Sequence, residues 1–144
     1  MAYAEKQLIA MYGDQADNSF TLVGTGVKAR WAPSTQGCHI RRFSVVVEVA
    51  ATTTACVMTL KKRPTPGSAA GEVILQTLTL SATEAAGAVV YGNDLQAAIL
   101  PGEQVVVDVT TAGVAAVRNY AYLEIDPDWE TSGNFKATMI NRTT

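Results

Sequence analysis

The chain has 144 residues, enough for one domain with a sizeable hydrophobic core, so neither metal ions nor disulfides are required to hold it. Its formal net charge of −2 lacks the basic excess of a nucleic-acid-binding protein, and no apolar stretch approaches the ~20 residues of a membrane span. We therefore expect neither nucleic acid nor a membrane as a partner. Residues 1–6 lack a positively charged head followed by an apolar segment, which predicts a protein made and kept in a cytoplasm.

Short candidate strands separated by turn residues make up the first part of the chain. They cover residues 6–12, 20–23, 28–31 and 40–49, with a polar turn at 13–19. The last of them is the strongest, because its apolar residues alternate strictly and share one face: Phe43, Val45, Val47 and Val49. We therefore predict that residues 40–49 form a core strand.

The second part of the chain continues the pattern, with candidate strands at 56–63, 73–80 and 89–91. Between the last two, Ser81 and Glu84 have the spacing of a capping box, which predicts one short helical turn. Residues 94–100 are ambiguous. After the turn at Pro101 and Gly102, two alternating strands flank a glycine-bearing loop, and we expect them to form a hairpin. Its buried face is predicted to hold Val105, Val107, Val109, Val117, Ala121, Leu123 and Ile125.

Seven or eight short strands with turn signals between them are typical of an all-β domain, an antiparallel β-sandwich or jelly roll. We expect one domain over residues 1–144, with an N-terminal arm at 1–19, a body at 20–125 and a polar C-terminal tail at 126–144. A monomer would leave such a tail loose, because it has too little apolar surface to fold alone. The tail does contain four large apolar residues, spaced so that they could dock on a neighbouring subunit: Trp129, Phe135, Met139 and Ile140.

The two cysteines, Cys38 and Cys56, flank the strand at 40–49. A hairpin turning near 52–54 would leave Cys38 far along the ladder from Cys56, so we expect free, mostly buried thiols, with a bridge across two sheets as the alternative. His39 follows Cys38, and neighbouring strand residues point to opposite faces, so the two make a poor nucleophile pair. These three side chains could supply zinc ligands, but no CxxC or HxxxH spacing is present.

The acidic run Asp126, Asp128 and Glu130 could offer oxygens to calcium, yet Pro127 stiffens it and a calcium loop needs further ligands. The glycines at 24–26 lack the third glycine and the helix of a dinucleotide site. Any two acids could meet in the fold as a glycosidase pair, but nothing in the sequence singles out a pair. We therefore predict no catalytic, cofactor-binding or metal site.

Two groups of residues are candidates for an interface. If residues 40–49 pair with 56–63 as a hairpin, five basic residues gather at one end of it: Arg41, Arg42, Lys61, Lys62 and Arg63. They serve either solubility and edge protection or contact with an acidic partner surface. Aromatic residues that could stack on sugars or proteins are Trp31, Tyr91, Tyr120, Tyr122 and Trp129. Tyr120 and Tyr122 oppose the apolar face of their strand, which favours a protein interface or packing between subunits.

Three segments resemble the head decoration, or cement, proteins of tailed bacteriophages. They are IRRFSVVV at residues 40–47, LPGEQVVVDVTTAG at 100–113 and AYLEIDPD at 121–128. The resemblance covers the central and C-terminal two thirds of the chain. It implies a β-sandwich or jelly-roll body that assembles as a trimer or another oligomer, binds the major capsid protein on the capsid exterior, and catalyses nothing. Such a protein is assembled in the host cytoplasm and ends in the virion.

The sequence thus favours a non-enzymatic viral structural protein that binds the outside of a capsid and stabilises the shell through its arms. The alternative is a receptor- or carbohydrate-binding module of a phage fibre, which would use exposed aromatic residues in a concave site. A third hypothesis, a small β-sandwich enzyme, has no recognisable active-site constellation to support it.

Overall fold

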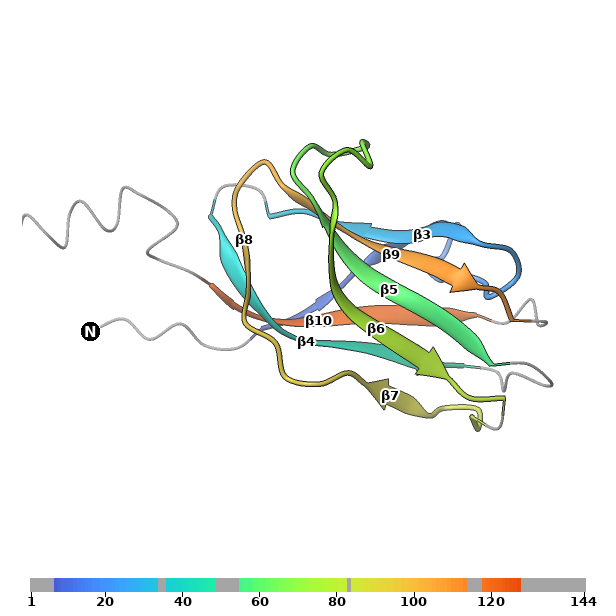
Figure 1. The fold of residues 1–144 in the computed structure, drawn as a ribbon. Coiled ribbons are helices and arrows are strands. Elements are labelled where there is room, and N and C mark those ends of the chain that lie inside the picture. The colour runs from blue at the N-terminus through green and yellow to red at the C-terminus, as the bar shows by residue number, and fades with distance from the viewer. Residues whose placement is uncertain (1–6, 34–35, 49–54, 83, 114–117, 128–144) are drawn as a thin grey trace, which may run out of the picture.

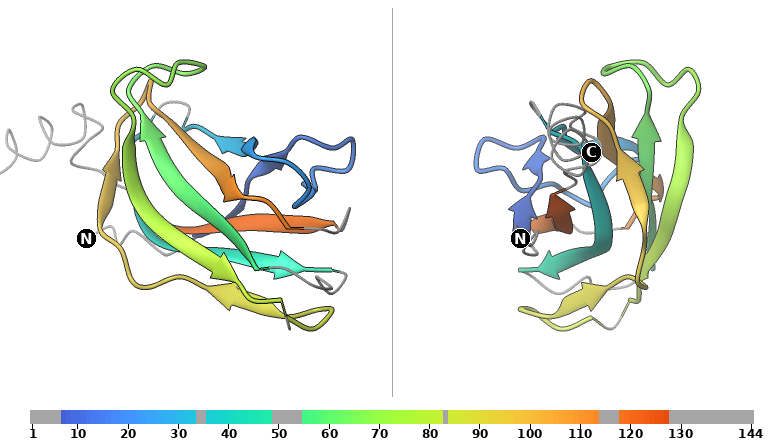
Figure 2. Two further views of the ribbon diagram at one scale, coloured as in Figure 1. Left: turned by 45° about the vertical axis from the view of Figure 1, so that its right-hand side comes forward. Right: turned by 90° about the vertical axis from the view of Figure 1, so that its left-hand side faces the viewer.

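The computed structural model describes residues 7–33, 36–48, 55–82, 84–113 and 118–127. Its ten strands form two antiparallel sheets of five strands each, which face each other as two layers (Figures 1 and 2). The described residues contain no helix. The prediction of an all-β sandwich is therefore confirmed.

Sheet A has the order β1-β10-β4-β7, and β8 also pairs with β4. Its strands are β1 (Gln7–Ala10), β4 (Cys38–Val47), β7 (Val89–Tyr91), β8 (Ala97–Ile99) and β10 (Asn119–Pro127). Sheet B has the order β2-β3-β9-β5-β6. Its strands are β2 (Tyr12–Gly13), β3 (Gly26–Trp31), β5 (Cys56–Arg63), β6 (Val73–Leu80) and β9 (Gln104–Thr111).

The inner faces of the two sheets pack together and form the hydrophobic core. The predicted alternation is confirmed for the described residues, because Val45 and Val47 of β4, Val107 of β9 and Leu123 of β10 are completely buried. Their neighbours in the core include Phe20, Leu22, Ile40, Phe43, Met58, Leu60, Leu80 and Ile99. Val49 and Val117 lie outside the described residues.

Both predicted hairpins are wrong. β4 lies in sheet A between β10 and the pair β7 and β8, whereas β5 lies in sheet B between β9 and β6. In the same way β9 belongs to sheet B and β10 to sheet A. The alternation of apolar side chains fixes which face of a strand is buried, but pairing uses the backbone edges, which carry no such signal.

Residues 7–19 belong to the body and are not an arm, contrary to prediction. β1 pairs with β10, with Gln7 opposite Ile125, and β2 pairs with β3. Between them Met11 is buried, and its N–H donates a hydrogen bond of 2.9 Å to the Ala121 carbonyl. The chain therefore passes from one sheet to the other within a few residues. Of the predicted arms, residues 1–6 and 128–144 lie outside the described residues.

Gly13 makes the turn after β2 feasible. Its N–H donates to the Asn18 carbonyl, and a Cβ at this position would collide with the backbone carbonyl oxygens of Asn18 and Ser19. Any other residue here would have to push backbone atoms apart. The glycine thus lets the segment fold tightly against sheet B.

The structure also tests three predictions about shorter segments and about the cysteines. The expected strand at 20–23 is a single bridge, between Phe20 and Asn119. The described residues around Ser81 and Glu84 form a turn rather than a helix, although the Ser81 hydroxyl does contact Glu84 Oε1 at 3.2 Å. Cys38 and Cys56 are not joined in a disulfide and are buried, as expected, and burial raises the pKa of the Cys56 thiol.

We predict that Val107→Asp unfolds the domain. Val107 is completely buried in the core, and an unpaired carboxylate there would destabilise the protein by more than about 3 kcal/mol. Chemical denaturation followed by circular dichroism measures the change. The matched control is Thr110→Asp, on the exposed end of the same strand, which should unfold within about 0.5 kcal/mol of the wild type. A folded Val107→Asp variant with wild-type stability would contradict the assigned core.

Candidate binding surface

The outer face of sheet A carries a row of aromatic and apolar side chains. The register places Tyr122 of β10 beside Ser44 of β4, and Ser44 beside Tyr91 of β7. One step along, Tyr120 lies beside Val46, which lies beside Val89. Leu8 of β1 completes the surface, which we call the tyrosine face: Leu8, Val46, Val89, Tyr91, Tyr120 and Tyr122.

The outermost side chains of the tyrosine face are uncovered. Leu8 is 65% exposed and Tyr91 is 61% exposed, while Tyr120 and Tyr122 are half-buried between their neighbours. Large exposed apolar and aromatic groups that lie next to one another are typical of surfaces that bind other proteins. The prediction that Tyr120 and Tyr122 face away from the core is confirmed, and the structure adds Tyr91, 29 positions before Tyr120 in the chain.

Arg42 lies at one end of this face. Its guanidinium donates to Asp94 Oδ1 at 2.7 Å, lies 3.6 Å from Glu124 Oε2 and stands 5.7 Å from the centre of the Tyr91 ring. The hydrogen bond to Asp94 is the main reason that the pKa of Arg42 is raised. Arg42 and Tyr91 border a shallow depression of about 410 Å³, together with Gln7, Leu8, Ser44 and Glu124. This end of the face can hydrogen-bond a ligand as well as stack on it.

Tyr120 lies at the other end of the face, next to a charged cluster. Arg118 pairs with Asp17 at 3.2 Å and with Glu48 at 3.6 Å. Burial raises the pKa of the Tyr120 phenol, and the negative charges of Glu48 and Asp17 raise it further. The phenol, whose ordinary pKa of 10 already keeps it protonated at neutral pH, can donate a hydrogen bond.

The five basic residues do not gather as predicted. Because β4 and β5 belong to different sheets, Arg41 and Arg42 lie on sheet A, whereas Lys61, Lys62 and Arg63 lie on sheet B. Each has an acidic partner within the chain: Arg41 pairs with Asp126 at 3.5 Å, and Lys62 pairs with Glu103 at 3.7 Å. This arrangement favours solubility over contact with an acidic partner surface.

Part of the outer face of sheet B carries a network of ion pairs, beside which Ile74 of β6 is 60% exposed. Lys61 Nζ lies 3.1 Å from Glu72 Oε1 and 2.8 Å from Asp108 Oδ2, and Arg63 Nε lies 3.1 Å from Glu72 Oε2. Val106, which points away from the core in this region, is nevertheless completely buried. This network could not be predicted from the sequence, because Asp108 meets Lys61 only through the pairing of β5 with β9.

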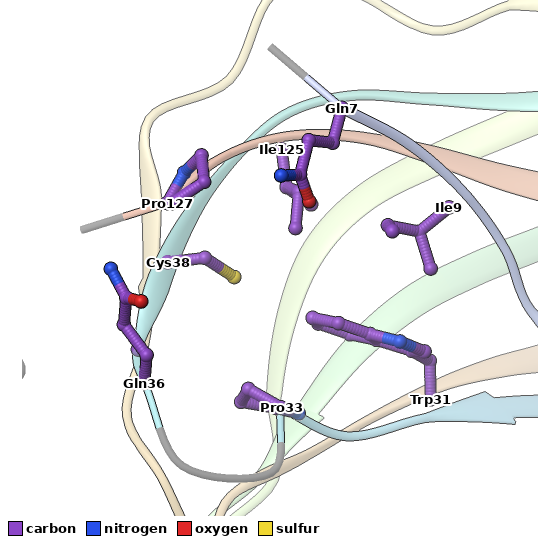
Figure 3. A pocket seen from close by; sticks show the side chains of 9 residues that line it. Gln7, Ile9, Trp31, Pro33, Gln36, Cys38, Ile125 and Pro127 are labelled. Carbon is purple, nitrogen blue, oxygen red and sulfur yellow. The ribbon is translucent and has the colours of Figure 1, made fainter. Parts of the chain in front are cut away.

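A crevice opens at the end of the sandwich where β1 and β4 begin and β3 and β10 end (Figure 3). It has a volume of about 250 Å³, and Trp31 and the Cys38 sulfur point into it. The rest of the lining comes from Gln7, Ile9, Pro33, Gln36, Gly37, Ile125 and Pro127. The Gln36 side-chain nitrogen is buried and has no hydrogen-bond partner within the described part of the chain.

Metal-binding groups do not come together in the described ranges. No three His, Cys, Asp or Glu side chains among these residues are placed to hold a metal ion. Cys38 is buried, whereas His39 is half-exposed, as expected for neighbours on one strand. Asp126 pairs with Arg41, and Asp128 and Glu130 lie outside the described residues. No helix in the described part of the chain is suited to crossing a membrane.

The remaining predicted interface residues follow Pro127, outside the described residues. They are Trp129, Phe135, Met139 and Ile140.

We predict that the ion-pair network on sheet B makes stability depend on pH. Lys61, and then Arg63, hold the pKa of Glu72 below its ordinary value of 4.5. A carboxylate with a lowered pKa stabilises the fold above that value, and the stabilisation is lost as the pH falls. Glu72→Gln should therefore melt at a lower temperature than the wild type at pH 7, and the two melting temperatures should converge toward pH 3. A difference that does not change with pH would contradict the role of this carboxylate.

No known protein-family model matches the chain, and no curated protein matches it either. What the chain binds therefore has to be inferred from its own surfaces.

Proposed function

We propose that the protein is a non-enzymatic viral structural protein that binds the exterior of a phage capsid as a homo-oligomer, most simply a trimer, and strengthens the shell. The observation that supports this most directly is the tyrosine face. It presents exposed Leu8 and Tyr91 on the flat outer side of sheet A, where a protein surface can pack against them. The partner is the major capsid protein.

Two further features support the proposal. Sheet B carries its charges in internal pairs, so its outer face offers a partner few free charges, and the tyrosine face is the better contact surface. In addition, Gln7 and Pro127 lie at the same end of the body. The segments beyond them therefore leave from one place, from which they can reach neighbouring subunits.

A carbohydrate-binding module of a phage fibre is the second candidate. The depression beside Tyr91 favours it, because an exposed ring next to Arg42 and Glu124 provides both stacking and hydrogen bonding. The two functions differ in what is bound. A decoration protein binds the capsid lattice, whereas a fibre module binds glycans.

We predict that Tyr91→Ala weakens capsid binding roughly tenfold or more, because exposed tyrosines at the centre of an interface commonly contribute more than about 1 kcal/mol. The full chain is mixed with particles of the virus that encodes it, prepared without this protein, and binding is measured by co-sedimentation. The matched control is Tyr12→Ala, because Tyr12 is 66% exposed but lies on β2 of sheet B.

The Tyr12 variant should bind as the wild type does. Equal loss in both variants, or none in either, would contradict the tyrosine face as the contact surface. Failure of the wild-type protein to bind capsids, together with retention on a glycan array that Tyr91→Ala abolishes, would replace the proposed function with the fibre module.

A further inference from the structure

The crevice at the end of the sandwich has the chemistry of a peptide-binding site. Its walls combine apolar side chains, Ile9, Trp31 and Ile125, with polar groups that include the side chain of Gln36 (Figure 3). A buried donor that finds no acceptor is costly, and the Gln36 side-chain nitrogen is such a donor. A segment that brought one apolar side chain and one backbone carbonyl would satisfy both requirements.

The chain itself carries a segment of this kind. Residues 128–144 follow Pro127, and in this mainly polar segment the large apolar residues are Trp129, Phe135 and the adjacent pair Met139 and Ile140. At ~3.3–3.6 Å per residue, an extended chain from Pro127 to Ile140 reaches roughly 45 Å. A compact domain of this size is roughly 30–35 Å across. The segment is therefore long enough to reach a neighbouring copy.

We propose that this crevice binds the C-terminal segment, residues 128–144, of a neighbouring copy of the chain. Pro127 forms part of the crevice wall, and β10 runs out of the body there. A chain that leaves at the rim would have to reverse at once to enter its own crevice, whereas a neighbour's segment can enter directly.

Each copy has one crevice and one C-terminal segment, so every copy can both give and receive a segment. Such head-to-tail contacts form a ring when the rotation between neighbouring copies closes. A ring of three is the homotrimer of the proposed function, on which this inference rests. Burying one apolar side chain per crevice would add a contact that the tyrosine face does not provide.

Cys38 makes the contact testable in the full chain. Cys38 is 2% exposed and its sulfur points into the crevice, whereas Cys56 is completely buried in the core and does not line the crevice. Single cysteines are introduced beside the apolar residues of the segment, as Asn134→Cys, Thr138→Cys and Asn141→Cys. The control is Thr25→Cys, an exposed position before β3, at the end of that strand away from Trp31. Each variant is sized by light scattering and then oxidised with diamide.

At least one segment variant should give covalent dimers and trimers on a non-reducing gel. These bands should disappear when Cys38→Ala is added, and Thr25→Cys should give none that depend on Cys38. A trimer by light scattering without such crosslinks would overturn the crevice as the docking site and leave the proposed function standing. A monomer would overturn the proposed oligomer together with the exchange. A disulfide within one chain would show that the crevice holds the chain's own segment, which overturns the exchange alone.

Discussion

Burial of apolar side chains between the two sheets is the interaction on which the rest of the structure depends. The strands that contribute these side chains alternate between the two sheets along the chain. β3 lies in sheet B, β4 in sheet A and β5 in sheet B, and β9 lies in sheet B whereas β10 lies in sheet A. Neither sheet can bury its inner face without the other, and no single hairpin holds a complete core. We therefore expect the body to fold as one cooperative unit, because its parts gain little from forming alone.

The outer faces of the two sheets carry different kinds of side chain. On sheet B, Lys61 and its acidic partners lie over an outward-facing valine, and next to them Ile74 of β6 is 60% exposed. On sheet A, the corresponding positions hold tyrosines and Leu8, with charged residues only at the two ends. A protein that needed only to remain soluble would have little reason to leave the second surface apolar. That contrast is why the tyrosine face is the surface on which the proposed function depends.

Much of the fold could be predicted from the sequence, because a period of two in Val45 and Val107 fixes which face is buried. The partner of each strand could not, since the hydrogen-bonding edge is backbone, and so the pairing of 40–49 with 56–63 was wrong. The tyrosine face could be predicted only in part, because side-chain direction follows from the sequence of one strand whereas strand pairing does not. The outward direction of Tyr120 and Tyr122 follows from their own strand, but Tyr91 joins them only through the register of β4 with β7.

The pairing of Gln7 with Ile125 also has a mechanical consequence. Because β1 and β10 run antiparallel and both chain ends leave from this pair, a force that pulls the ends apart loads their hydrogen bonds one after another. Bonds loaded in sequence separate at a lower force than bonds that share the load. A subunit bound to a capsid as proposed would therefore carry tension better across the faces of its sheets than through its two ends.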